Sequence, residues 1–388
     1  MIDAGSKRLA SVQPAIIPII DELVSQNPGT ISLGQGVVHY PPPAQAREEF
    51  EGFWAEATHH RYGSVAGIER LRDLITNKLI SDNKIDLLQR FVLVTAGSNM
   101  GFLNVVLSIT DPGDEIILLI PYFFNQEMAI HIAGCNPVLV ETDAYYQPVL
   151  ARIEQAITSK TRAVVTVSPN NPTGAVYSEQ ILHKINSLCL EHNIYHISDE
   201  AYEYFTYENC LHFSPASIDG SSGHTIAMYS LSKSYGFASW RIGYVVAPAE
   251  LQTSLEKMQD TNVICPPIAS QFAAVGALEV GKKYIKEHVR ELGETRKSIF
   301  ESLEEIKHKV KIVEPMGAFY MFLDLEHHNS QDMELVRSLI EQYGVALIPG
   351  AAFGVRDRCC LRLSYGAIHP SMVSDGISRL IRGITELA

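Results

Sequence analysis

The chain has 388 residues, of which 46% are hydrophobic and 19% are charged; this composition excludes disorder as the main state and supplies a sizeable core. Its 44 acidic and 31 basic side chains give a formal net charge of -13, which disfavours nucleic acid as a partner but allows a local pocket to bind one small anion. Six cysteines without a CxxC pair exclude a disulfide framework and indicate a reducing compartment.

The N-terminal segment carries Lys7 and Arg8 before an apolar stretch that Pro14 and Pro18 interrupt. No small-residue cleavage site follows, so we expect a mature cytoplasmic start rather than a signal peptide. The longest apolar runs, such as EIILLIPYFF, are shorter than the about 20 residues that a spanning helix needs, so no membrane segment is expected.

Residues 1–45 contain a predicted helix near 14–26 and the Gly-rich run ISLGQG at 31–36. We expect this segment to have no sheet of its own and to dock on the C-terminal domain.

Residues 46–270 alternate short β-branched runs with stretches of helical length and period. Helices are expected at 98–110, 122–134, 149–157 and 178–192. The seven strand candidates are FVLVTAG at 91–97, EIILLI at 115–120, PVLVE at 137–141, RAVVTVS at 162–168, NIYHIS at 193–198, TIAMYS at 225–230 and RIGYVVA at 241–247. Strands bounded by helices predict an α/β domain with a seven-stranded, mostly parallel sheet flanked by helices. A ligand of such a sheet binds beyond the carboxyl ends of the strands.

The pattern changes after residue 270, and residues 271–388 are predicted to form a smaller α+β domain. Its elements are long charged helices at about 268–280 and 283–308, GAFYMFLDL at 317–325, a helix near 332–343, VALIPG at 345–350 and CLRLSYG at 360–366.

Two predicted strand ends carry residues that suit a phosphate. The run at 91–97 leads through Ser98 and Asn99 into a helix, where backbone N–H groups and the helix dipole favour an anion; an ordinary strand-to-helix turn explains them equally well. Ser230, Ser232, Lys233 and Arg241 lie within twelve positions near the sixth run. Hydroxyls and a guanidinium suit phosphate oxygens, and a desolvated lysine can act as a nucleophile. By themselves, a solvated lysine and an ion-paired arginine are the commoner interpretation.

Polar residues also follow the fourth and fifth runs, in SPNNPTG at 168–174 and SDEAY at 198–202. Each motif alone is typical of a helix cap or a turn. Caps and turns do not explain why both motifs fall at the same edge of one sheet.

In chain order, the motifs TAGSN, PYF, SPNNPTG, SDEAY, SLSKSYGFASWRIGY and CLRLSYG resemble the pattern of the class I and II pyridoxal-phosphate-dependent aminotransferases, of fold type I. The resemblance extends from ISLGQG at 31–36 to RLSYG at 362–366. It implies transfer of the amino group of an L-amino acid to a 2-oxo acid by a ping-pong mechanism, with pyridoxal 5′-phosphate as the cofactor.

The resemblance also implies roles for single residues. Lys233 would form the Schiff base with the cofactor and then move the substrate proton, and Asp199 would lie against the pyridine nitrogen. Asn171 and Tyr202 would donate hydrogen bonds to the phenolic oxygen of the ring. The other cofactor contacts that it implies are the backbone amides of Ser98 and Asn99, the hydroxyls of Ser230 and Ser232, the guanidinium of Arg241 and the ring of Tyr122 stacked on the pyridine.

On the substrate side, Arg362 resembles the arginine that binds the α-carboxylate, with help from Gly36 and Asn171; a structural ion pair is the alternative. Tyr62 resembles the tyrosine that reaches the phosphate of the neighbouring subunit, which implies a homodimer. The His59–His60 and His327–His328 pairs lack metal-ligand spacing, so no metal is predicted.

No second arginine has motif support for binding a side-chain carboxylate. We therefore expect a substrate with a neutral side chain, aromatic or thioether, for which residues 37–40 could line a pocket or could be ordinary entrance-loop packing. A carbon–sulfur or β-elimination lyase on the same cofactor shares the cofactor motifs and stays open. A cofactor-sensing regulator would need a DNA-binding module, for which we expect no room outside the motifs.

Overall fold

The computed structural model describes residues 5–325 and 331–387 of the chain. The His327–His328 pair lies outside the described residues.

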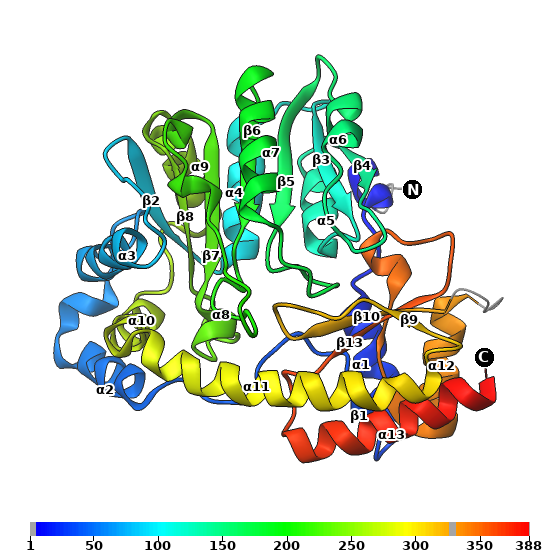
Figure 1. Ribbon diagram of the computed structural model, residues 1–388. Helices are drawn as coiled ribbons and strands as arrows, with labels where there is room; N and C mark the ends of the chain where they lie inside the picture. The colour runs from blue at the N-terminus through cyan, green and yellow to red at the C-terminus, as the bar shows by residue number, and fades with distance from the viewer. Residues whose placement is uncertain (1–4, 326–330, 388) are drawn as a thin grey trace.

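The larger sheet has seven strands in the order β2–β8–β7–β6–β5–β3–β4 (Figure 1). Strand β8 is antiparallel to β2 and β7, and the other neighbours are parallel. The prediction of a seven-stranded, mostly parallel sheet is therefore confirmed. The strands are β2 (Arg90–Thr95), β3 (Glu115–Ile120), β4 (Asn136–Glu141), β5 (Thr161–Val167), β6 (Tyr195–Asp199), β7 (Thr225–Ser230) and β8 (Gly243–Pro248).

Helices cover this sheet, which explains why its central strands are apolar without alternation. All six residues of β7 and of β8 are buried, whereas β4 at the edge leaves Leu139 exposed. Ser178 caps one of the helices, because its hydroxyl accepts a hydrogen bond from the backbone N–H of Ile181. The helices around the sheet are α3 (Glu69–Ser81), α4 (Ser98–Ile109), α5 (Phe124–Ile132), α6 (Leu150–Ala156), α7 (Glu179–Glu191), α8 (Leu231–Ser234) and α9 (Gln252–Val263).

The smaller sheet is antiparallel, in the order β12 (Ile348–Pro349), β13 (Cys360–Ser364), β10 (Tyr320–Asp324) and β9 (Lys311–Ile312). With α12 (Asp332–Tyr343) and α13 (Pro370–Leu387) it forms the predicted α+β part. Helix α11 (Lys282–Leu303), in yellow, runs below the larger sheet and across the smaller part in Figure 1. It ends before the predicted residue 308, because a 3₁₀ turn at Glu304–Ile306 follows it.

The N-terminal segment contains α1 (Ile16–Gln26) and the two-residue strand β1 (Ile31–Ser32). Strand β1 pairs in parallel with β11 (Val345–Ala346), so the segment is hydrogen-bonded to the C-terminal part.

Helix α2 (Ala44–Gly52) packs on α10 (Ile268–Val280), which also contacts α3. Most of α10 falls inside the predicted C-terminal domain, yet it packs on helices of the predicted large domain. The limits 1–45, 46–270 and 271–388 stay a prediction. Within the described ranges, no helix is both long and apolar enough to cross a membrane.

Candidate active site

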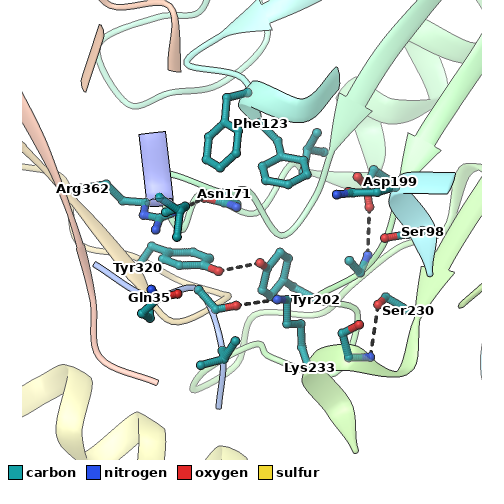
Figure 2. A pocket seen from close by; sticks show the side chains of 18 of the residues that line it. Gln35, Ser98, Phe123, Asn171, Asp199, Tyr202, Ser230, Lys233, Tyr320 and Arg362 are labelled. Carbon is teal, nitrogen blue, oxygen red and sulfur yellow. Dashed lines mark hydrogen bonds between the residues drawn. The ribbon is translucent and has the colours of Figure 1, made fainter. Parts of the chain in front are cut away.

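A cavity of about 220 Å³ opens at the carboxyl ends of β5, β6 and β7. Residues of the large sheet line one side, and Tyr320 of β10 and Arg362 of β13 line the other, as Figure 2 shows. The predicted site residues that line it are Gly36, Ser98, Asn99, Asn171, Asp199, Tyr202, Ser230, Ser232, Lys233, Arg241 and Arg362.

Lys233 lies in the short helix α8, which begins where Ser230 accepts a hydrogen bond from the backbone N–H of Ser232. Its Nζ points into the cavity and donates to the carbonyl oxygen of Gly36. Burial, with the charges of Arg362 and Arg241, lowers the pKa of Lys233 to about 8. A substantial fraction of the amine is therefore neutral near pH 7.5, which a nucleophile requires.

Asp199 ends β6 and is buried. Its Oδ2 accepts a hydrogen bond from Gln126 Nε2 over 2.8 Å, and its Oδ1 accepts one from the backbone N–H of Ala201. Burial raises the pKa of Asp199 to about 6, against the effect of these two donors. The carboxylate is thus mostly ionised at pH 7 and is placed to pair with a cationic group of a ligand.

Arg362 is also buried, in β13. Its Nη1 donates to Asn171 Oδ1 over 3.1 Å, and its Nη2 donates to the carbonyl oxygen of Gly34. Its guanidinium carbon lies 4.7 Å from the ring centre of Tyr320 and 5.0 Å from that of Phe353. Among the described residues no carboxylate lies within ion-pair distance of Arg362, so the structure lacks the ion pair that was the alternative.

Arg241 follows α8 and precedes β8 in the chain, and its guanidinium lies beside the start of α4. The turn before this helix uses Gly97 with a φ of +80°, and a Cβ there would lie 2.1 Å from Arg241 Nη2. The guanidinium, the N-terminus of α4 and the hydroxyls of Ser230 and Ser232 therefore converge on one place. Such a convergence suits the oxygens of a phosphate.

These donors and acceptors fit pyridoxal 5′-phosphate. Arg241, like Arg362, has no carboxylate within ion-pair distance among residues 5–325 and 331–387. Two cavity-lining arginines without a carboxylate partner suit two anionic groups of a ligand, such as a phosphate and a carboxylate. The buried carboxylate of Asp199 and the low-pKa amine of Lys233 match a protonated ring nitrogen and an aldehyde.

Tyr122 does not line the cavity. Its ring is buried against Gly354, where a Cβ would lie 2.4 Å from Tyr122 Cε1. Its neighbours Phe123 and Phe124 line the cavity instead. The stacking of Tyr122 on the cofactor ring therefore stays a prediction, and Phe123 is a second candidate for that role.

Two other predictions concern residues that lie wholly or partly outside the cavity of a single chain, namely Tyr62 and residues 37–40. Tyr62 is 80% exposed and does not line it. Of residues 37–40, Val37 lines it, whereas Tyr40 stacks on His288 and donates to the carbonyl oxygen of Lys233.

His59, of the His59–His60 pair, donates a hydrogen bond from Nδ1 to the carbonyl oxygen of Phe53 and packs on Phe272. In the described parts of the chain, no group of three or more His, Cys, Asp or Glu could hold a metal ion.

The sequence analysis missed three residues at this site, Gln126, Tyr320 and Phe123. Phe123 and Gln126 follow strand β3, so the rule on carboxyl ends could have found them. Tyr320 carries no such signal, because it lies within a strand of the smaller sheet.

Comparisons with known proteins agree with this geometry. Residues 28–380 match the family model of aminotransferase class I and II. The aromatic aminotransferase ISS1 of Arabidopsis thaliana is 34% identical, over 98% of this chain and 96% of that relative. A probable aspartate/prephenate aminotransferase of Aquifex aeolicus is 35% identical, over 84% of each chain.

The solved structures to which this chain is similar are also aminotransferases. The aspartate aminotransferase from Thermus thermophilus with maleate superimposes with a TM-score of 0.91 at 28% identity, covering 98% of this chain and 100% of that chain. The aromatic aminotransferase from Pyrococcus horikoshii superimposes with a TM-score of 0.87 at 30% identity, over 95% of this chain and 99% of that one.

Proposed function

The chain belongs to the class I and II aminotransferases, enzymes that use pyridoxal 5′-phosphate. We propose that it moves the amino group of an L-amino acid to a 2-oxo acid by a ping-pong mechanism, and that the side chain of this amino acid is neutral, either aromatic or a thioether. The names of the relatives divide between aromatic and aspartate/prephenate aminotransferases, so they do not select a substrate.

One observation carries the proposal of a neutral side chain. The cations that line the cavity are Lys233, Arg241 and Arg362, and each already has a proposed partner in the cofactor or the α-carboxylate. The other residues on the Arg362 side are apolar or uncharged, namely Ile17, Gln35, Val37, Phe123 and Tyr320. A second substrate carboxylate would be desolvated there without a cation, which is costly.

The bound cofactor supplies an aldehyde and an electron-withdrawing pyridinium ring. Asp199 would keep the ring nitrogen protonated through its charge, and Asn171 and Tyr202 would donate hydrogen bonds to the ring oxygen. The hydroxyls of Ser230 and Ser232, the guanidinium of Arg241 and the amides at the start of α4 would hold the phosphate.

On the substrate, Arg362 binds the α-carboxylate and so orients the α-carbon toward Lys233, with the backbone N–H of Gly36 on the same carboxylate. Lys233 Nζ would then take the proton from the α-carbon of the substrate. Its pKa of about 8 suits that task, because such an amine both accepts and releases a proton near neutral pH.

We further propose a homodimer in which Tyr62 reaches the phosphate of the neighbouring site. The 80% exposure of Tyr62 agrees with this proposal, because it leaves the ring free to contact a neighbouring chain. We also propose a cytoplasmic location, supported by six cysteines that are all free thiols.

A half-reaction tests the function. The enzyme loaded with cofactor is mixed with one amino acid and no oxo acid, and the absorbance spectrum and released ammonia are followed. A transaminase stops after one turnover in the amine form of the cofactor, and we expect phenylalanine, tyrosine and methionine to convert it faster than aspartate. Continuous ammonia release would instead indicate the lyase. Faster conversion with aspartate would contradict the neutral side chain. Lys233→Ala is the control, and it should show no conversion.

A further inference from the structure

Two tyrosine hydroxyls from different parts of the chain meet in the cavity. Tyr202, which follows β6, and Tyr320, in β10, have their hydroxyl oxygens 2.6 Å apart, and both side chains are buried. Figure 2 shows Tyr320 extending from the side of Arg362 toward Tyr202. The contact therefore joins the proposed cofactor side of the site to the proposed substrate side.

Tyr320 is held on two further sides. The guanidinium carbon of Arg362 lies 4.7 Å from its ring centre, a cation–π contact inside the protein. At Gly36, a Cβ would lie 2.8 Å from the Tyr320 hydroxyl oxygen, so the glycine leaves only enough room for that hydroxyl. The Tyr320 hydroxyl thus has little freedom to turn away from Tyr202.

The two hydroxyls cannot both donate to each other, so the direction of the bond matters. Burial raises the pKa of Tyr202 well above its ordinary value, and the neighbouring Tyr320 adds to the rise. Burial also raises the pKa of Tyr320, and the charge of Arg362 opposes the rise at both hydroxyls. Each hydroxyl carries one proton; because that of Tyr202 is proposed to donate to the ring oxygen of the cofactor, the Tyr320 hydroxyl is the donor in the bond between the two tyrosines.

We propose that Tyr320 is a positioning residue that acts through Tyr202. The Tyr320 hydroxyl donates to the Tyr202 oxygen, so that the Tyr202 proton is directed to the ring oxygen of the cofactor. The Tyr320 ring also supports the Arg362 guanidinium through the cation–π contact. This inference rests on the proposed roles of Tyr202 and Arg362. It gives Tyr320 two separable contributions, one from the hydroxyl and one from the ring.

Tyr320→Phe removes the hydroxyl and keeps the ring. A weaker Tyr202 hydrogen bond leaves more negative charge on the ring oxygen, so the Lys233 nitrogen bound to the cofactor holds its proton to higher pH. The pH midpoint of the visible absorption band should therefore rise by about half to one unit, the worth of one ordinary hydrogen bond. The KM for the amino acid should stay within about twofold. Tyr320→Leu removes the ring as well, and should also raise KM by about two- to tenfold.

A double-mutant cycle separates this role from a structural one. In the Tyr202→Phe background, Tyr320→Phe should no longer shift the midpoint. Tyr365→Phe is the matched control, because Tyr365 is a buried tyrosine whose hydroxyl meets that of Tyr207 outside the cavity; it should leave the midpoint unchanged.

Three results would overturn the inference: an unchanged midpoint in Tyr320→Phe, an equal shift in the Tyr202→Phe background, or an equal shift in Tyr365→Phe. Each of these leaves the function standing, provided the unmodified enzyme shows the visible band and converts amino acids. Loss of that band or of that conversion in the unmodified enzyme would contradict the proposed function and this inference together.

Discussion

Gln126 Nε2 donates a hydrogen bond to Asp199 Oδ2 over 2.8 Å, and both side chains are buried at the end of the large sheet. The donor stabilises the ionised carboxylate, because it opposes the effect of burial on the pKa of Asp199. The charge that the site presents to the pyridine nitrogen therefore depends partly on Gln126.

Gln126→Leu should weaken cofactor binding at pH 7. Loss of the donor raises the pKa of Asp199 above about 6, so fewer molecules carry the charge, and a hydrogen bond to a charged group is worth about 1.5 to 3 kcal/mol. That loss shifts the pKa by about one to two units, so we expect a dissociation constant about 2 to 15 times higher at pH 7, largely restored at pH 8.5 as Asp199 ionises. Fluorescence titration of the cofactor-free protein measures it. Gln147→Leu, at a glutamine that bonds the carbonyl of Val176, is the control, and the prediction fails if Gln126→Leu binds like the parent.

Lys233→Met should stabilise the cofactor-free protein. The folded-state pKa of about 8 lies below the ordinary 10.5, so the unfolded chain binds the extra proton between these values and stability rises with pH there. Below pH 8 the buried charge costs the folded state up to about 3 kcal/mol, at about 1.4 kcal/mol per pH unit. The variant should gain about 1 to 3 kcal/mol in urea unfolding at pH 7, and the gain should shrink toward pH 10. A gain that is equal at both pH values would rule out titration of Lys233 as the cause.

Arg362→Ala should raise the KM for the amino acid at least about 100-fold, because a bidentate, charge-assisted pair with the α-carboxylate is lost. The cofactor should stay bound, since its phosphate contacts Arg241 and the α4 terminus. Steady-state kinetics and the absorbance spectrum measure the two effects. Arg358→Ala, at an arginine paired with Asp324 outside the cavity, should leave KM unchanged. An unaltered KM in Arg362→Ala would mean that another group binds the carboxylate.

Phe123→Ala and Tyr122→Ala test which residue stacks on the cofactor ring, since each removes one ring. Ring stacking is worth about 0.5 to 1.5 kcal/mol beyond area burial, so Phe123→Ala should weaken cofactor binding by about three- to tenfold or more. The Tyr122 ring does not line the cavity, so Tyr122→Ala should leave the cofactor affinity of the folded protein unchanged. The reverse pattern of cofactor affinities would identify Tyr122 as the stacking residue.

Tyr62→Ala tests the shared site. If Tyr62 serves the neighbouring chain, mixing Tyr62→Ala with the inactive Lys233→Ala should restore activity, because mixed dimers contain one site with both native residues. The mixture is compared with each variant alone after the subunits have exchanged. No gain on mixing, with dimers present by light scattering, would place Tyr62 outside the site.

The sequence by itself determined the larger sheet, since all seven predicted runs of β-branched residues are strands of one sheet. It also determined that Lys233, Asp199 and Asn171 lie near one another, because the carboxyl ends of neighbouring parallel strands meet at one edge of a sheet. Those are consequences of local periodicity and of chain topology. Tertiary structure alone decided that Phe123 rather than Tyr122 faces the cavity, that Gln126 supports Asp199, and that Tyr320 connects Arg362 to Tyr202. These outcomes depend on tertiary packing, and contacts such as Gln126–Asp199 and Tyr202–Tyr320, which join residues 73 and 118 positions apart, leave no trace in local sequence patterns.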